Sequence, residues 1–125
     1  MGISVSWYDQ SHQALLFTYQ RPWKWHEFDQ AVAAMLAALD DSPRTVDLIF
    51  DISAAGLPPS GDLSRFKRVS EINHPRSGKV IFVGGQSLVM NLVDLLIKLY
   101  GRAFRPPDFI FVLSLEEASL RLQPS

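Results

Sequence analysis

Residues 45–64 read TVDLIFDISAAGLPPSGDLS, and this stretch decides the fold class. The run 46–50 is almost continuously apolar, which is typical of a strand that is covered on both faces of a sheet. Asp51 follows the strand, and a turn rich in Gly, Pro and Ser then leads into a new helix. Ligands of open α/β sheets collect where strand ends lead into helices, so this junction is the first place to look for a site.

Apolar periodicity predicts the other elements on both sides of this stretch. The spacing predicts strands at 3–7, 14–19, 80–83 and 109–113, and helices over 25–39, 63–72 and 88–100, with a short last helix opened by the capping pair Ser114 and Glu117. We therefore expect one α/β domain over 1–125 in the order β-β-α-β-α-β-α-β-α. Its sheet should be mostly parallel, with the N-terminal hairpin strand antiparallel.

The same pattern predicts which side chains form the core. Residues expected to be almost fully buried on central strands are Phe50, Ile81, Phe82, Phe111 and Val112.

Composition narrows the range of functions. The chain has 125 residues, 12 Lys and Arg against 13 Asp and Glu, and no Cys. A net charge near zero gives no reason to expect nucleic acid or an anionic membrane as a partner. The lack of Cys excludes disulfides, a thiol nucleophile and thiolate metal sites. No basic, apolar leader opens the chain and its longest apolar run is too short for a bilayer, so we expect a cytoplasmic protein.

The length, the element order and the strand that leads into Asp51-Ile52-Ser53 resemble the STAS domain. That family includes bacterial anti-sigma-factor antagonists and the cytoplasmic tails of sulfate transporters. The W-x-W-x-x-F spacing over 23–28 is similar to a stand-alone bacterial branch of the superfamily without assigned activity. The resemblance implies a STAS-like fold and a non-enzymatic regulatory or protein-interaction function, with a kinase or an anti-sigma-like regulator as partner.

The resemblance also implies a candidate phosphorylation site. In antagonist members a serine at the start of a helix is phosphorylated, and Ser60-Gly61 fall near that position, although Pro59 stands where the family has an acid. Ser60 has two interpretations: a phosphoacceptor whose added charge the helix N-terminus stabilises, or an ordinary N-cap. Asp51, Ser53 and Gly61 would line the site.

No catalytic constellation is complete in the sequence. Phosphoacceptor chemistry at Asp51 would need an acid pair after the first strand and a Lys near the last strand, and neither is present. Asp51 is therefore interpreted as a carboxylate that bonds backbone amides. The segment 84–87, GGQS, lacks the nucleotide-binding glycine patterns and predicts a tight turn with Ser87 as N-cap. We expect no enzyme activity, no cofactor and no metal; an enzyme using strand-end carboxylates is the weakest alternative.

The helix expected over 88–100 is apolar around most of its circumference. It is either wedged between the sheet and other helices, or it contacts a partner, a second copy of the chain, or an apolar ligand. We expect a homodimer that uses Met90, Val93, Ile97 and Tyr100. The alternative function is a carrier of a small apolar or lipid ligand, similar to CRAL-TRIO domains. Trp23 and Trp25 could line such a ligand site.

Overall fold

The structure is a computed structural model that describes residues 2–59, 64–72, 74–101 and 109–122. The elements occur in the predicted order. They are β1 (Ile3–Trp7), β2 (Ala14–Gln20), α1 (Trp25–Asp41), β3 (Val46–Ala54), α2 (Ser64–Ser70), β4 (Ser77–Val83), α3 (Gln86–Tyr100), β5 (Phe109–Val112) and α4 (Leu115–Ser119).

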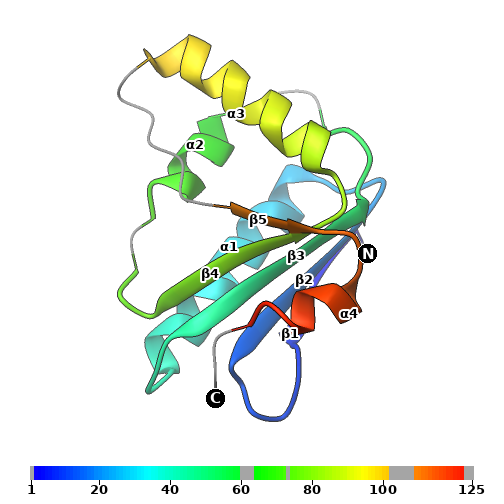
Figure 1. Ribbon diagram of the computed structural model, residues 1–125. Coiled ribbons are helices and arrows are strands. Elements are labelled where there is room, and N and C mark those ends of the chain that lie inside the picture. The colour runs from blue at the N-terminus through cyan, green and yellow to red at the C-terminus, as the bar shows by residue number, and fades with distance from the viewer. Residues whose placement is uncertain (1, 60–63, 73, 102–108, 123–125) are drawn as a thin grey trace.

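The five strands form one sheet in the order β1-β2-β3-β4-β5 (Figure 1). β1 and β2 pair antiparallel as a hairpin, whereas β2, β3, β4 and β5 pair parallel. The helices between the parallel strands provide the crossovers that such pairing requires. The α/β class and the mostly parallel sheet with an antiparallel N-terminal strand are therefore confirmed.

Two local predictions are wrong. β3 does not end at Phe50, because Asp51 pairs on both sides, with Thr18 of β2 and Val83 of β4, and the strand continues to Ala54. Helix α3 begins at Gln86 instead of being capped by Ser87.

The residue that precedes α3, Gly85, has a left-handed conformation with φ of 66°. Gly84 before it has φ of 73°. Two successive left-handed residues make a tight turn that favours glycine. A Cβ at Gly85 would also collide with the side chain of Ile52. These two glycines fix the point at which the chain leaves β4 and starts α3.

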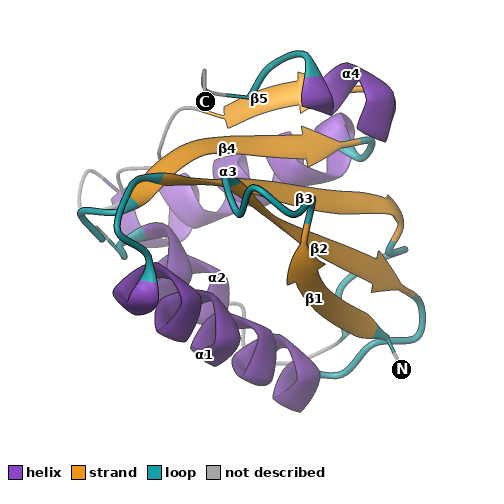
Figure 2. Cartoon of the chain, turned by 90° about the horizontal axis from the view of Figure 1, so that it is seen from below, coloured by secondary structure: helices purple, strands orange, loops and turns teal. Residues whose placement is uncertain are grey.

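The helices cover the two faces of the sheet unequally. Helices α1, α2 and α3 lie on one face, and the short helix α4 lies on the other (Figure 2). Leu48 of β3 packs in the core cluster on the α1 side, and its neighbour Ile49 packs in the cluster that includes Ala118 of α4. Both faces of this part of β3 are thus covered, as its apolar run predicts.

A row of phenylalanine rings crosses the sheet on the α1 side. Phe17, Phe50, Phe82 and Phe111 are in register on four adjacent strands. Their ring centroids are 4.5, 5.4 and 5.7 Å apart in turn, and neighbouring rings lie within 26° of parallel. Cross-strand aromatic pairs of this kind stabilise the register of a sheet.

The burial of this row corrects part of the predicted core. Ile81 and Val112 are buried as expected. Phe50, Phe82 and Phe111 are only half-buried. The reason for Phe111 is its place on β5, which is an edge strand and not a central one. Phe50 and Phe82 are central, but they border the cavity described below.

Two carboxylate side chains link neighbouring elements by accepting hydrogen bonds from backbone N–H groups. Asp47 is fully buried, and its Oδ1 accepts a hydrogen bond of 2.8 Å from the backbone N–H of Lys79 on β4. Glu27 accepts hydrogen bonds from the backbone N–H groups of Gly2, at 2.7 Å, and Lys24, at 3.0 Å. The bond from Gly2 lowers the pKa of Glu27. Glu27 thereby joins the start of β1 to the first turn of α1.

Phe17 and Phe111 provide a matched test of the core. Phe17 is 1% exposed, so Phe17→Ala should lower the free energy of unfolding by about 3–5 kcal/mol. Phe111→Ala removes the same atoms from a half-buried edge position and should cost less than half as much. Urea denaturation of both variants measures the difference, and equal losses would contradict the described packing.

Candidate functional site

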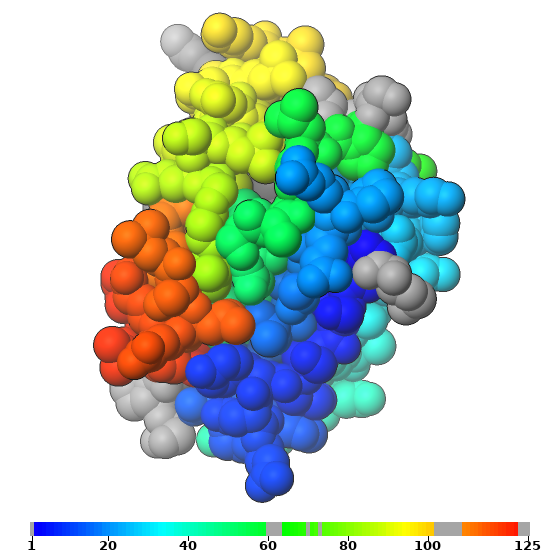
Figure 3. Space-filling view, turned by 90° about the vertical axis from the view of Figure 1, so that its right-hand side faces the viewer, coloured from blue at the N-terminus to red at the C-terminus, as the bar shows by residue number. Residues whose placement is uncertain are grey.

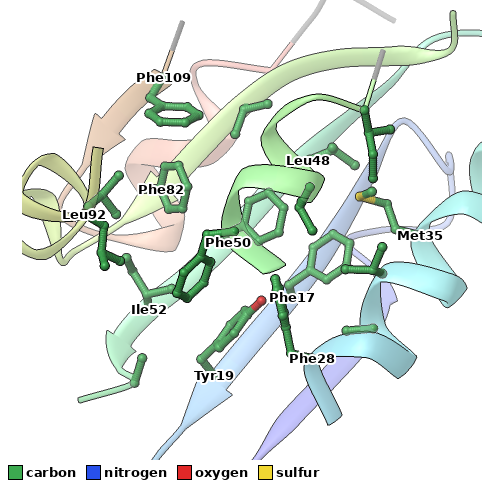
Figure 4. A pocket seen from close by; sticks show the side chains of 18 of the residues that line it. Phe17, Tyr19, Phe28, Met35, Leu48, Phe50, Ile52, Phe82, Leu92 and Phe109 are labelled. Atoms are coloured by element: carbon green, nitrogen blue, oxygen red, sulfur yellow. The ribbon is translucent and has the colours of Figure 1, made fainter. Parts of the chain in front are cut away.

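A cavity of about 630 Å³ lies between one face of the sheet and helices α1, α2 and α3 (Figure 4). Its lining is predominantly aliphatic and aromatic, and it draws on β2, β3, β4, β5 and all three helices. Small-molecule sites in proteins are concave, mostly apolar and of this size. The cavity is therefore the candidate functional site.

Phenylalanines form the floor of the cavity. Phe17, Phe50 and Phe82 belong to the row that crosses the sheet, and Phe109 of β5 packs edge-on against Phe82 with centroids 5.0 Å apart. Phe50 and Phe82 are half-buried and present part of their ring surface to the cavity, whereas Phe17 is almost fully buried beneath it. Figure 4 shows these side chains extending from the strands toward the cavity.

The first two helices form one wall as a unit. Phe28 and Met35 of α1 line the cavity and are buried. Helix α2 is held against α1 by Phe66, whose ring centroid lies 5.2 Å from that of Trp25 and 5.3 Å from that of Phe28. Arg65 of α2 adds an ion pair to Asp29 of α1, with Nε 3.4 Å from Oδ1.

Helix α3 forms the opposite wall. Figure 1 shows it standing away from the sheet along much of its length. Leu92 lines the cavity from this helix, with Val89 and Leu96, which are buried. At its far end the Nζ of Lys67, on α2, lies 5.0 Å from the ring centroid of Tyr100. This cation–π contact joins α2 to α3.

Seen from the side, the molecule is hollowed between α3 and the segment that follows β3. Figure 3 shows this depression between the yellow atoms of α3 and the green atoms near β3. Gly56 and Pro58 of that segment line the cavity, as does Leu88 in the first turn of α3.

Most polar side chains at the cavity already have partners within the protein. Trp23 Nε1 donates a 3.2 Å hydrogen bond to the carbonyl of Ala55. His74 Nε2 lies 2.7 Å from Oδ1 of Asp40, while its Nδ1 accepts a 3.0 Å bond from the backbone N–H of Arg76. This pattern places the proton of a neutral His74 on Nε2.

The remaining polar lining residues are Ser77, Lys79 and Tyr19. Ser77 begins β4 and is partly exposed. Lys79 directs its Nζ to the carbonyl of Arg121, beyond α4 on the other face of the sheet, at 2.8 Å. Tyr19 is buried, and among the described residues its hydroxyl has no hydrogen-bond partner. Burial raises the pKa of this phenol, so the hydroxyl stays neutral.

The residues that the sequence analysis favoured lie elsewhere. Asp51 Oδ1 accepts hydrogen bonds from the N–H of Ser53, at 3.2 Å, and from its Oγ, at 2.6 Å. Phe50 and Ile52 line the cavity, so the strand alternation places Asp51 and Ser53 on the opposite face. Asp51 thus bonds a backbone amide, as expected from its interpretation as a carboxylate that bonds amides and not as a phosphoacceptor.

The other members of the predicted phosphorylation site, Ser60 and Gly61, lie outside the described residues. Both interpretations of Ser60 stay predictions. Of the two tryptophans, Trp23 lines the cavity, whereas Trp25 packs on Phe28 and Phe66 beside it.

The predicted interface on α3 is exposed in part. Met90 is 42%, Ile97 44% and Tyr100 36% exposed. Val93 differs from the expectation, because it is half-buried and lines the cavity. The helix therefore has two apolar sides, one facing the cavity and one facing outward.

Two other classes of site find no support in the described part of the chain. Its His, Asp and Glu residues form no group of three or more that could hold a metal ion. Within the same residues, no helix combines the length and the apolar character needed to cross a membrane.

Comparison with protein-family models, with curated proteins and with solved structures finds no match for this chain. The STAS resemblance therefore stays a prediction that rests on element order and on the segment around Asp51.

Sequence reasoning missed Tyr19 as a site residue. Its strand was predicted, and alternation places Leu15, Phe17 and Tyr19 on one face. The signal in the sequence that could have identified Tyr19 was a hydroxyl at the end of this otherwise apolar strand face. That the hydroxyl has no partner depends on which side chains surround it in the fold.

The raised pKa of Tyr19 predicts a pH dependence of stability. The folded protein holds this proton more tightly than the unfolded chain, whose tyrosines titrate near pH 10, so stability should fall as the pH rises above about 10. Tyr19→Phe should remove this contribution, up to about 1.4 kcal/mol per pH unit. Urea denaturation at several alkaline pH values measures it. Parallel pH profiles for the variant and the parent would show that Tyr19 is not buried as described.

Proposed function

We propose that this protein is a non-enzymatic carrier or sensor of a small apolar ligand, which binds in the cavity between the sheet and α1, α2 and α3. The observation that supports this function is the cavity of about 630 Å³ with its floor of phenylalanines. A carrier of a small apolar or lipid ligand was the alternative function at the level of the sequence, and the geometry now favours it over the interaction module.

The lining of the cavity argues that an apolar ligand fills it. The volume equals that of about 20 water molecules, but its apolar walls offer water few hydrogen bonds. An apolar ligand would replace that poorly bonded water and bury the exposed ring surfaces of Phe50 and Phe82.

The chemistry of the lining supports binding more than catalysis. Acid–base or nucleophilic mechanisms need a nucleophile or base with an orienting partner. Among the described lining residues, Trp23 and His74 are held in hydrogen bonds to other parts of the protein. Tyr19 adds a neutral hydroxyl without a base beside it.

Two substitutions on α3 test whether the cavity binds ligand. Leu92 faces the cavity, whereas Leu99 is 61% exposed. Leu92→Trp inserts a larger side chain into the cavity, and it should weaken binding of the neutral fluorescent probe N-phenyl-1-naphthylamine by about tenfold. Leu99→Trp, the matched control, should leave the affinity within about twofold. Fluorescence titration measures both affinities.

Circular dichroism checks that both variants are folded. Val93→Trp provides a second variant that fills the cavity from the same helix. Equal probe binding by the parent, the cavity variants and Leu99→Trp would place the probe elsewhere and overturn the proposal. Native mass spectrometry of the freshly purified protein gives an independent result, because a retained ligand adds its mass.

The exposed side of α3 favours a second candidate function, that of a STAS-like cytoplasmic interaction module that acts as a homodimer. Met90 and Ile97 are exposed there beside Asp94 and Lys98. These two opposite charges lie one helical turn apart. In an antiparallel pair of α3 helices related by a two-fold axis, Asp94 of one copy can meet Lys98 of the other. A second copy of the chain is therefore the partner that this surface fits.

Ile97→Asp tests the homodimer. The charge would be buried without a partner at the interface, so the dimer should dissociate at least tenfold more readily while the monomer stays folded. Light scattering coupled to size-exclusion chromatography measures the mass of each species. The control is Leu120→Asp, at a position that is 80% exposed away from α3. A parent protein that is monomeric at high concentration would contradict this second function and leave the cavity proposal intact.

A further inference from the structure

We propose that the ligand is a neutral, largely apolar molecule that carries a carbonyl or hydroxyl oxygen, and that the Tyr19 hydroxyl binds this oxygen. The inference rests on the proposed function, because it assigns the chemical class of the ligand in the same cavity.

The position of Tyr19 carries the inference. The residue is 8% exposed and lies near the end of β2. Figure 4 shows its hydroxyl oxygen pointing toward the middle of the cavity, near Phe17 and Phe50. Its ring packs edge-on against Trp23, with centroids 5.4 Å apart, which holds it in this orientation. Within the part of the chain that the structure describes, no group accepts from or donates to this hydroxyl.

The Tyr19 hydroxyl faces an apolar cavity and has no protein partner among the described residues, so its hydrogen-bonding capacity is available to a ligand. The neighbouring polar groups show the usual outcome. Trp23 Nε1 reaches the carbonyl of Ala55, and both ring nitrogens of His74 are engaged. Tyr19 departs from this pattern at the point where a ligand would lie. The missing partner is therefore expected to come from the ligand.

The same surroundings favour a neutral ligand over an anion. A carboxylate buried beside Tyr19 would need a cation, since an unpaired buried charge is costly. Among the described lining residues, Lys79 directs its amine to the carbonyl of Arg121 on the other face of the sheet. His74 uses its Nε2 to bond Asp40. Tyr19 itself stays protonated because burial raises its pKa, so it can donate to a carbonyl or accept from an alcohol.

Three probes of similar shape test this inference. They are 2-acetylnaphthalene, a neutral ketone; 2-ethylnaphthalene, the corresponding hydrocarbon; and 2-naphthoate, the corresponding anion. Their dissociation constants are measured by calorimetry or by displacement of N-phenyl-1-naphthylamine. The proteins compared are the parent, Tyr19→Phe and a control, Tyr8→Phe. Tyr8 packs against the core cluster on the α4 side of the sheet, away from the cavity.

We expect the parent to prefer the ketone to the hydrocarbon by about tenfold, since the hydrocarbon leaves the Tyr19 hydroxyl unpaired. Tyr19→Phe should reduce this preference to about twofold or less, mainly by weakening ketone binding, and Tyr8→Phe should retain it. The dissociation constants of the ketone and the hydrocarbon, each measured with the parent and with Tyr19→Phe, form a double-mutant cycle. In this cycle, differences unrelated to the hydroxyl cancel.

The outcomes separate this inference from the proposed function. If no probe enters the cavity, the proposed function fails. If ketone and hydrocarbon bind the parent and Tyr19→Phe with the same ratio, the cavity binds apolar ligands but Tyr19 does not recognise an oxygen, and the inference is wrong. If 2-naphthoate binds most tightly, the ligand is an anion, and the inference is also wrong.

Discussion

The in-register pairing of the parallel strands determines both the core and the cavity of this protein. It places Phe17, Phe50 and Phe82 side by side on one face of the sheet. These stacked rings lie between the sheet and the helices, so over this part of the sheet the helices pack on the rings and not directly on the strands. Helices α1 and α2 close over one part of this floor through Phe28 and Phe66, and α3 stands over the other. A slip of one residue in any strand would turn its phenylalanine to the opposite face and remove part of the floor.

The sequence predicted the fold well because the fold follows from local periodicity. The alternation at 3–7 and the apolar run at 46–50 required only the spacing of side chains, and both became strands. The predicted end of β3 was wrong because pairing with neighbouring strands outweighs the polarity of a single residue. Asp51 was expected to end a strand, yet hydrogen bonding to β2 and β4 on both sides carries β3 past it.

The candidate site could be predicted only in outline. The broad apolar circumference of α3 did indicate a ligand, a partner or a second copy, and the helix indeed has a cavity side and an exposed side. The sequence could not show that Val93 and Ile97 lie on different sides, because this depends on how α3 is oriented over the sheet. The sequence pattern instead favoured the junction after β3, where Asp51 and Ser53 are bonded to each other.

The turn of Gly84 and Gly85 has a consequence for how this protein can evolve. Side chains are excluded there by the left-handed backbone and by the close approach of Ser53 and Ile52, so the start of α3 is fixed relative to the sheet. Positions further along the helix, such as Leu92, touch the cavity without being part of the sheet. Mutations at such positions can change the shape of the cavity while the strand register is conserved. Related chains could thus share one scaffold and bind different molecules.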